Sequence, residues 1–299
     1  MLLDRLRERG SPAHAALLRV VLAVHVLFVL QSPALGLLIE VEPELHPQAA
    51  VVGGAAFYAL LSPDRVALLQ LVGTLAAACV AVGLAGRVAL GILLISFLAT
   101  QMYWFGGTLF HDDWIYFVFP MLAFLTATES TAYSVDGWLR RAKVEAETQR
   151  REARLIVESW VFWIGFVYLA AGIAKLFPLS KGVVWLSGIA AQEFAIEFVR
   201  QSPAVALFGE PVFPYEQRWI FMLGSIATVA IEIGAVAVWF TRRAYLPIAV
   251  GIFAMHIGIW LVGIPGFVGM FSVLVLALLP AGVFAKADAW WTRVATSSS

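Results

Sequence analysis

Repeated apolar runs dominate this sequence, each close to the length that a helix needs to cross the hydrocarbon core of a bilayer. The central run, residues 159–177, carries no charge except Lys175 near its end. Over the whole chain 61% of the residues are hydrophobic and 13% are charged, about half the charged share of a soluble domain. Within a membrane such segments must satisfy their own backbone hydrogen bonds as helices. We therefore predict an all-α, polytopic integral membrane helical bundle.

The pattern of apolar runs predicts about eight transmembrane helices with both termini cytoplasmic. The predicted spans are residues 14–37, 66–84, 88–105, a short span ending near residue 126, and residues 159–177, 219–240, 245–262 and 267–283. In this arrangement 14 of the 20 Lys and Arg residues lie in inner segments, as the positive-inside rule requires. The first run lacks a clear small-residue cleavage site, so we expect it to be retained as a span.

We expect one transmembrane domain over residues 1–299, with two long segments between its spans. Residues 129–154 are the most charged part of the chain and predict a cytoplasmic, partly interfacial helix. Residues 178–216 form an extracytoplasmic segment in which Glu193, Glu197 and Arg200 share one helical face, which predicts a surface lid.

Charge and cysteine content exclude several classes of partner. The formal net charge is zero, so no global field favours nucleic acid. The single cysteine, Cys79, excludes an intrachain disulfide and a cluster of thiolate ligands. We predict no metal site, and the expected surroundings are the lipid bilayer.

The lysine at the end of the central run is the first candidate functional residue. Tyr168, Gly172 and Lys175 are spaced i, i+4, i+7, which places a phenol, a bare backbone patch and an ammonium on one helical face. That face could line a site, because charged residues inside spans are costly and usually functional. The other interpretation is that Lys175 extends its ammonium into the headgroups as an anchor.

Two further charges lie inside predicted spans, Arg19 in the first and Glu232 in the sixth. An unpaired charge within a span costs several kcal/mol, so we predict that Arg19 and Glu232 pair.

Other titratable groups fall at the outer ends of the predicted spans. His111, Asp112 and Asp113 stand together at a membrane boundary, where a wet outer loop also explains them, and His256 lies in the outer half of the seventh span. A lone histidine in a span is more often a helix-to-helix hydrogen-bonding residue. With Lys175 at the same depth, a shared polar pocket is the favoured interpretation.

These residues carry a family resemblance. The pattern Y-x3-G-x2-K at Tyr168, Gly172 and Lys175, followed by W-x2-G at Trp185 and Gly188, resembles the HTTM (horizontally transferred transmembrane) family, the bacterial relatives of the vitamin K-dependent gamma-glutamyl carboxylase.

Other segments of the family occur in the same order. They are the arginine of the first helix (Arg19), a histidine followed by an apolar span and SVDG (His111 and residues 134–137), an acid in a later span (Glu232), and a His-initiated segment from His256.

The resemblance implies a quinone-dependent chemistry. In the carboxylase a lysine at the position of Lys175 is held to act as the base on reduced vitamin K, and a histidine at the position of His111 assists. O2 then adds, the oxygenated quinone removes the gamma-proton of a glutamate, and CO2 adds to the carbanion. By resemblance, reduced vitamin K or menaquinone is the cofactor, and O2 and CO2 are co-substrates. A lysine desolvated at a membrane boundary is suited to act as a neutral base.

The expected protein is thus a vitamin K-dependent carboxylase-like enzyme of the bacterial plasma membrane, with its site facing the outer leaflet. The sequence ends soon after its last predicted span, so we expect no counterpart of the large luminal C-terminal part of the carboxylase. The acceptor substrate or peptide, the particular quinone and the oligomeric state are therefore left open. Two alternatives also stand: a non-enzymatic partner in peptide maturation, and a proton-linked transporter built on Arg19, Glu232 and His256.

Overall fold

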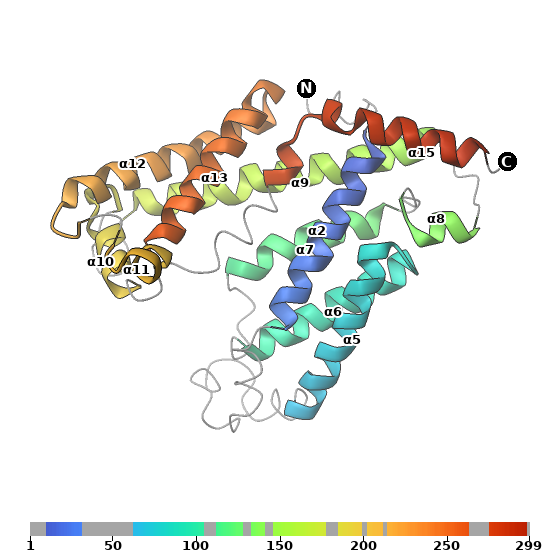
Figure 1. Ribbon diagram of the computed structural model, residues 1–299, viewed down its shortest axis with the longest axis horizontal. Helices are drawn as coiled ribbons and strands as arrows, with labels where there is room; N and C mark the ends of the chain where they lie inside the picture. The colour runs from blue at the N-terminus through green and yellow to red at the C-terminus, as the bar shows by residue number, and fades with distance from the viewer. Residues whose placement is uncertain are drawn as a thin grey trace. The chain divides into compact units, whose positions relative to one another are not determined.

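The computed structural model describes residues 10–31, 62–104, 112–127, 133–140, 146–177, 185–198, 202–211, 214–262 and 275–297 (Figure 1). Over these residues the chain is helical, with no strand among them. The predicted all-α class is confirmed for this part of the chain.

The chain forms two compact units. Unit 1 is built from Trp160–Val283, and unit 2 from Leu6–Ser159 together with Phe284–Ser299. The central helix α9 (Ala146–Leu176) begins in unit 2 and ends in unit 1. Its 31 residues extend about 46 Å at ~1.5 Å per residue, which exceeds the ~30 Å thickness of a hydrocarbon core. The expectation of a single domain stays a prediction.

Unit 2 contains a bundle of apolar helices. Its members are α2 (Pro12–Leu30), α5 (Pro63–Val82), α6 (Gly86–Trp104) and α7 (Asp112–Thr126). Helix α2 packs against α5 and α7, and α6 packs between α5 and α7. The start of α2 is defined by Ser11, whose side chain accepts a hydrogen bond from the backbone N–H of His14, and by Pro12 in the first turn. In the core the rings of Phe97 and Phe117 meet edge to face at 5.8 Å.

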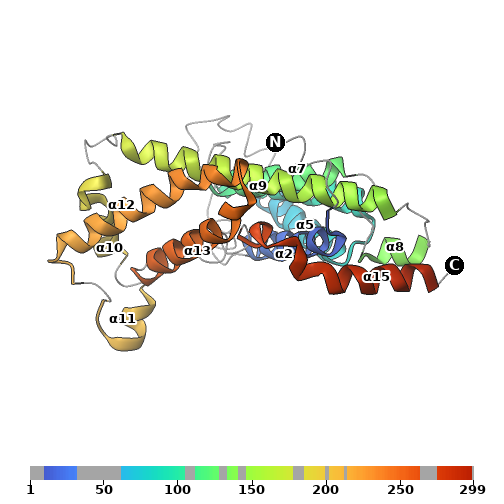
Figure 2. The same ribbon diagram turned by 90° about the horizontal axis from the view of Figure 1, so that it is seen from above.

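Unit 2 also contains the first part of α9 and two further helices, α8 (Val135–Arg140) and α15 (Ala285–Ser297). Helix α15 runs across the N-terminal end of α2 (Figures 1 and 2). The backbone N–H of Ala13 donates to Oδ1 of Asp288 at 2.9 Å, and the rings of His14 and Phe284 stack at 4.4 Å. The first turn of α2 therefore contacts both α15 and Phe284, the residue directly before α15.

Unit 1 is organised around the second part of α9 and two consecutive helices, α12 (Arg218–Gly234) and α13 (Tyr245–Leu261). Helices α12 and α13 pack against each other and are connected through the 3₁₀ turns η4 (Ala235–Trp239) and η5 (Arg242–Ala244). Nε1 of Trp239 donates to the carbonyl of Phe162 at 3.0 Å. The indole ring lies against Gly165, where a Cβ would overlap it. This glycine lets the end of η4 dock on α9.

In the part of the chain that the structure describes, five helices are long and apolar enough to cross a membrane: Pro12–Leu30, Pro63–Val82, Glu147–Leu176, Arg218–Trp239 and Arg242–Leu261. Two shorter apolar helices, Gly86–Gln101 and Phe117–Thr126, coincide with the third and fourth predicted spans. The eighth predicted span begins outside the described residues, and its described part consists of the turns η6 (Leu276–Leu278) and η7 (Ala281–Phe284). The number of eight spans and the cytoplasmic position of the termini stay predictions.

The charged segment 129–154 is helical in its described residues, and its cytoplasmic position stays a prediction. Its described residues form α8 and the first turns of α9, so the charged residues from Ala146 onward continue without a break into the central helix. No Gly or Pro separates the charged turns from the apolar run, so nothing ends the helix there. A buried i, i+4 ion pair between Arg154 and Glu158 supports the junction.

The predicted lid, residues 178–216, contains several short helices in its described part. Its described part contains η2 (Trp185–Ser187), α10 (Ile189–Glu197) and α11 (Pro203–Phe208), and Arg200 lies outside the described residues. Both η2 and α10 pack on α12. The hydroxyl of Ser202 donates to the carbonyl of Leu261 at 2.6 Å and attaches α11 to the end of α13. The function of a lid stays a prediction.

Candidate functional site

One face of α9 in unit 1 carries the predicted site residues. Gly165, Tyr168, Gly172 and Lys175 follow each other at helical spacing along this face. Gly172 is the point of closest approach to α12, because a Cβ there would lie 2.8 Å from Cγ1 of Ile233 and 3.0 Å from Cβ of Glu232. The bare backbone patch expected at Gly172 is therefore occupied by a neighbouring helix.

The close approach at Gly172 places Glu232 beside Lys175, one helical turn further along α9. Nζ of Lys175 donates to both carboxylate oxygens of Glu232, at 2.6 Å and 2.8 Å. The side chain of Lys175 is 19% exposed and that of Glu232 is 6% exposed. A hydrogen-bonded pair of this kind compensates two charges that would each be strongly unfavourable alone in an apolar surrounding.

An aromatic ring completes the surroundings of the lysine. Nζ of Lys175 lies 5.4 Å from the centre of the Trp185 ring, within the range of a cation–π contact. Trp185 belongs to η2, which packs on α12. The ammonium is thus held by a carboxylate from one segment and by an indole from another.

A second polar pair lies on the same face of α9. The hydroxyl of Tyr168 and Nε2 of His256 are 2.9 Å apart, and both side chains are buried. His256 belongs to α13, and the positive charge of Lys175 acts on its imidazole. Which of the two groups donates depends on the histidine tautomer. Either way, the two pairs form one polar cluster in unit 1, with Tyr168, Glu232 and His256 buried and Lys175 partly exposed.

The second half of the motif explains how η2 reaches this cluster. Gly188 has φ = +76° and ends η2, and a Cβ there would overlap the backbone of Met222 in α12. Only glycine combines this conformation with this close approach. Nε of Arg218 adds a hydrogen bond of 3.2 Å to the carbonyl of Ser187. These contacts hold η2 on α12 and so position the Trp185 ring.

The remaining predicted site residues are not among the described members of this cluster. Arg19 lies in α2 of unit 2, and His111 lies outside the described residues. Asp112 and Asp113 begin α7, but their side chains are outside the described part. The polar pocket expected from all of them is therefore seen only for its four members in unit 1.

The predicted ion pair between Arg19 and Glu232 is wrong. Glu232 binds Lys175, whereas Nη2 of Arg19 donates to the backbone carbonyl of Tyr133 at 2.7 Å. The carboxylate of Asp136 is close enough to interact electrostatically with the same guanidinium. Arg19 and Glu232 thus each bind a residue of their own unit.

The SVDG segment around Arg19 forms a second polar arrangement, in unit 2. Ser134 caps α8 by accepting a hydrogen bond from the N–H of Gly137 at 2.9 Å. Oδ2 of Asp136 accepts from the N–H of Gly86 at 3.1 Å, and the N–H of Asp136 donates to the carbonyl of Gly83 at 3.1 Å. The segment is therefore bound to the turn between α5 and α6, and Arg19 binds the carbonyl of Tyr133, the residue that precedes it.

Tyr133 and Asp136 were not singled out by the sequence as partners of Arg19. The sequence did contain a signal that the SVDG segment begins a helix, because Ser and Asp at this spacing are typical of helix capping. Tyr133 stacks on Trp291 of α15 at 4.6 Å between ring centres. Burial raises the pKa of its phenol to about 12, and the negative charge of Asp288 adds to the effect. The ring is therefore neutral throughout the physiological pH range.

The cluster in unit 1 can transfer protons. It contains an amine, a carboxyl group, a phenol and an imidazole on three helices, and all of these are groups that act as general acids or bases. Among the described residues no group of three or more His, Cys, Asp or Glu side chains is arranged to hold a metal ion. No known protein-family model matches the chain, and neither a curated protein nor a solved structure is significantly similar to it.

Proposed function

We propose that the protein is an integral-membrane enzyme that deprotonates a reduced lipid quinone, vitamin K or menaquinone hydroquinone, with Lys175 as the base. The observation that carries this proposal is the Lys175–Glu232 pair beside the Tyr168–His256 pair, inside an apolar unit. Ionisable groups gathered in an apolar site are typical of catalytic centres. The resemblance of the surrounding motif to quinone-dependent carboxylases supplies the substrate class.

The ion pair provides a route to the neutral amine that a base requires. Transfer of one proton from Nζ of Lys175 to Glu232, across 2.6 Å, turns two buried charges into an amine and a carboxylic acid. An apolar surrounding favours this form because neither group then needs hydration. The amine can then accept the hydroxyl proton of the quinol, which leaves a quinol anion beside the new ammonium.

The other members of the cluster would support this step. The ammonium stays close to the Trp185 ring, which stabilises its charge. Tyr168 and His256 can exchange a proton through their hydrogen bond, so the site is able to pass a proton onward. We assign His111 to the same reaction on the resemblance alone, with Asp112 and Asp113 as its neighbours. O2 is the expected oxidant of the quinol anion, and CO2 the expected second co-substrate.

The proposal places this site in the outer leaflet of the bacterial plasma membrane. Lys175 lies in the last turn of α9, the end that the charge distribution assigns to the outside. A prenylated quinone would reach it from the lipid, and an unknown acceptor or peptide from the aqueous side.

Oxygen uptake by the purified protein with menaquinol tests the proposal. Lys175→Arg keeps the positive charge and roughly the length of the side chain, but a guanidinium remains protonated and cannot act as a base. We expect wild-type uptake to be abolished in Lys175→Arg and retained in the matched control Lys286→Arg, which makes the same change at an exposed lysine. Equal turnover in Lys175→Arg and wild type would show that Lys175 is an anchor.

A wild type that turns over neither menaquinol nor reduced vitamin K would overturn the enzymatic proposal. Proton flux in proteoliposomes that depends on Glu232 and His256 would then favour the transporter, and the absence of flux the non-enzymatic partner. The transporter is the weaker alternative, because Arg19, one of its three expected residues, is engaged in the SVDG arrangement of unit 2.

A further inference from the structure

Helix α12 carries one buried stripe that includes a hydroxyl group. Its members are Phe221, Ser225, Val229 and Glu232, which follow each other at spacing i, i+4, i+8 and i+11. Ser225 is 2% exposed, and among the described residues its Oγ has no hydrogen-bond partner. A buried hydroxyl of this kind is unfavourable, because it has lost its hydrogen bonds to water. Packing of the helix alone therefore does not explain a serine at this position.

The stripe joins Ser225 to the proposed site. Glu232, which binds Lys175, lies seven residues after Ser225, or about 10 Å along the helix. Side chains of a helix lean toward its N-terminus, so the carboxylate of Glu232 lies on the side of Ser225. The hydroxyl and the ion pair thus belong to the same face of α12, with two helical turns between them.

The turn η2 covers the same stretch of α12. Gly188 contacts the backbone of Met222, one turn before Ser225. The ring of Trp185, three residues before Gly188, lies 5.4 Å from Nζ of Lys175. The segment from the glycine to the indole therefore spans the part of α12 that contains Ser225.

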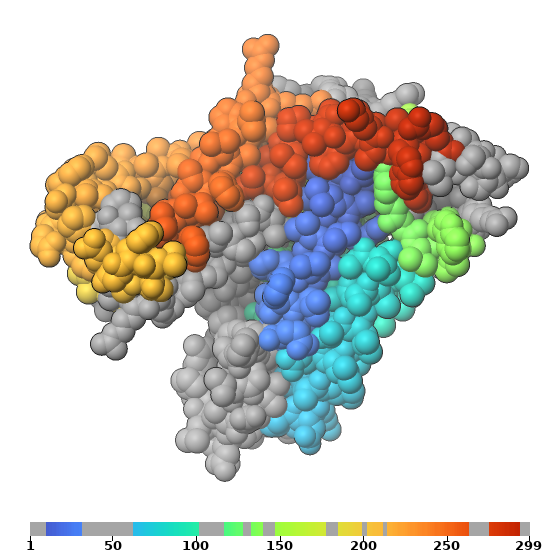
Figure 3. Space-filling view, in the orientation of Figure 1, coloured from blue at the N-terminus to red at the C-terminus, as the bar shows by residue number. Residues whose placement is uncertain are grey.

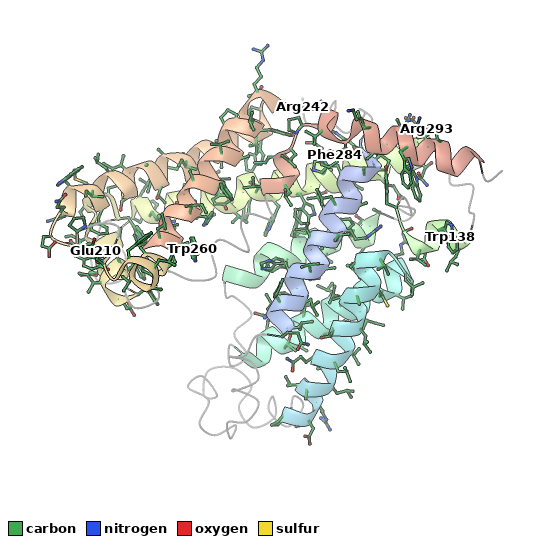
Figure 4. The ribbon with its side chains drawn as sticks, in the orientation of Figure 1. Trp138, Glu210, Arg242, Trp260, Phe284 and Arg293 are labelled. Atoms are coloured by element: carbon green, nitrogen blue, oxygen red, sulfur yellow. The ribbon has the colours of Figure 1, made fainter. Side chains whose placement is uncertain are left out.

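The stripe lies toward the end of unit 1 at which α12 begins. In Figure 4, Arg242 marks the turn between α12 and α13, while Glu210 and Trp260 mark the opposite end of these helices. The segments around α11 and the start of α12 form the surface there (Figure 3). Helix α9 runs antiparallel to α12 and carries Lys175 in its last turn, so Lys175 and Ser225 belong to the same end.

The chemical order along this face is hydroxyl, apolar side chain, ion pair. Val229, which is 5% exposed, separates Ser225 from Glu232. A hydroquinone has a matching order, because its two hydroxyl groups lie on opposite sides of an apolar ring. The side chains of Lys175 and Trp185 are partly exposed, so the site can be reached from outside the unit.

We propose that Ser225 binds the second oxygen of the quinol whose first hydroxyl meets Lys175. This inference rests on the proposed function and adds a residue that determines substrate specificity. The ring lies along Val229, and the hydrogen bond at Ser225 holds the other hydroxyl at the lysine amine. A site that hydrogen-bonds a substrate hydroxyl discriminates against the analogue that lacks it, because its own polar group then stays unpaired.

Equilibrium binding of two compounds to the full-length protein in detergent, without oxygen, tests the proposal. Menadiol carries two hydroxyl groups on its ring system, and 2-methyl-1-naphthol lacks the second. We expect the wild type to bind menadiol about three- to ten-fold more tightly, the range for one neutral hydrogen bond. Ser225→Ala should bind the two compounds about equally. Ser96→Ala, the same change at a buried serine of α6 in unit 2, should keep the wild-type preference.

Thermal unfolding separates this role from a structural one. Ser225→Ala should be at least as stable as the wild type, because it removes a buried hydroxyl that has no partner among the described residues. Equal binding of the two compounds by the wild type would overturn the proposal, and this comparison needs no variant. A preference for menadiol that persists in Ser225→Ala would also overturn it.

The failure of this inference can be told apart from the failure of the proposed function. If oxygen uptake with menaquinol still requires Lys175 while Ser225→Ala keeps the preference for menadiol, only the assignment of Ser225 fails. A wild type that neither binds menadiol nor oxidises menaquinol overturns both.

Discussion

Lys175 shows how a single residue can be identified from sequence while its partner is not. Its position inside an apolar run marks it as a residue with a specific role. Its partner Glu232 lies 57 positions away and is brought within 2.6 Å by the packing of α9 on α12. Arg19 was an equally plausible partner by charge, but Tyr133 and Asp136 hold it in unit 2.

We predict strong energetic coupling between Lys175 and Glu232. Lys175→Met or Glu232→Leu alone should destabilise the protein by ~3 kcal/mol, the lower part of the range for buried pairs, because Lys175 is 19% exposed. The double variant should recover much of this loss, since it leaves no orphan charge. Thermal unfolding of all four proteins in one detergent measures the coupling.

Lys286→Met and Glu193→Leu form the matched control cycle. Their side chains lie in different units, so their effects should add. Simple addition of the Lys175 and Glu232 effects would mean that the ion pair contributes nothing to stability.

At the scale of elements, the glycines of α9 determine which helices can meet. Gly165 admits the Trp239 ring, and Gly172 admits the backbone of α12 seven residues later. Small residues at such spacing let helix backbones approach closely, which is the usual basis of packing in membranes. The Y-x3-G-x2-K pattern therefore combines a glycine at a helix contact with two polar residues. The close approach of α12 at Gly172 places Glu232 beside Lys175.

Gly172→Ala should be damaging, whereas Gly224→Ala should not. The added methyl at Gly172 would contact Ile233 and Glu232 at about 3 Å, and we expect a loss of ~1–3 kcal/mol from overpacking. Gly224 lies in the middle of α12 with no neighbouring atom within 4 Å of an added Cβ. Alanine there should be neutral or stabilise by up to ~1 kcal/mol, because it favours the helix. Thermal unfolding of both variants tests this contrast, and equal stability would contradict the close approach at Gly172.

The SVDG segment is the other element with a defined structural role. It links α2, the turn after α5 and the start of α6 through Arg19, Gly83 and Asp136. Gly83 has φ = +70°, and a Cβ there would overlap the side chain of Ser134. The segment thus connects three helices at one end of the unit 2 bundle, and its contacts give Arg19 a structural role.

For the whole molecule, the contacts in unit 2 bear on topology. The N–H of Gly10 donates to the carbonyl of Arg150 at 3.1 Å, so the segment before α2 meets the start of α9. Helix α15 meets α2 and Tyr133, and α8 meets the α5–α6 turn. All of these segments were predicted to lie on the inner side, and they gather at one end of unit 2. Their common location agrees with one cytoplasmic face, which stays a prediction.

Cysteine labelling tests that prediction. In a Cys79→Ala background, Arg151→Cys and Lys286→Cys should react with an impermeant maleimide only after the membrane is opened. Glu44→Cys, in the predicted outer loop, should react in intact cells. Labelling of Glu44→Cys and Arg151→Cys from the same side would contradict the orientation and, with it, an outer-leaflet position of Lys175. The Cys79→Ala protein without a new cysteine gives the background.

The apolar runs and the placement of charges were sufficient to predict the helical class and the positions of apolar helices, five of which are long enough to cross a membrane among the described residues. They also drew attention to Lys175, Tyr168, Glu232 and His256. Hydrophobic length and the presence of a charge within it are properties of a local stretch of chain, and they can be read without knowing what packs against it.

The pairing of these residues was decided by tertiary structure alone. Which charges meet depends on the rotation of each helix and on where glycines permit close approach, as Gly172 does for Glu232. The continuity of α9 from Ala146 and the docking of α15 likewise depend on contacts between distant segments. The sequence pattern shows which charges would be unfavourable to bury. Which partner compensates each charge depends on how the helices pack.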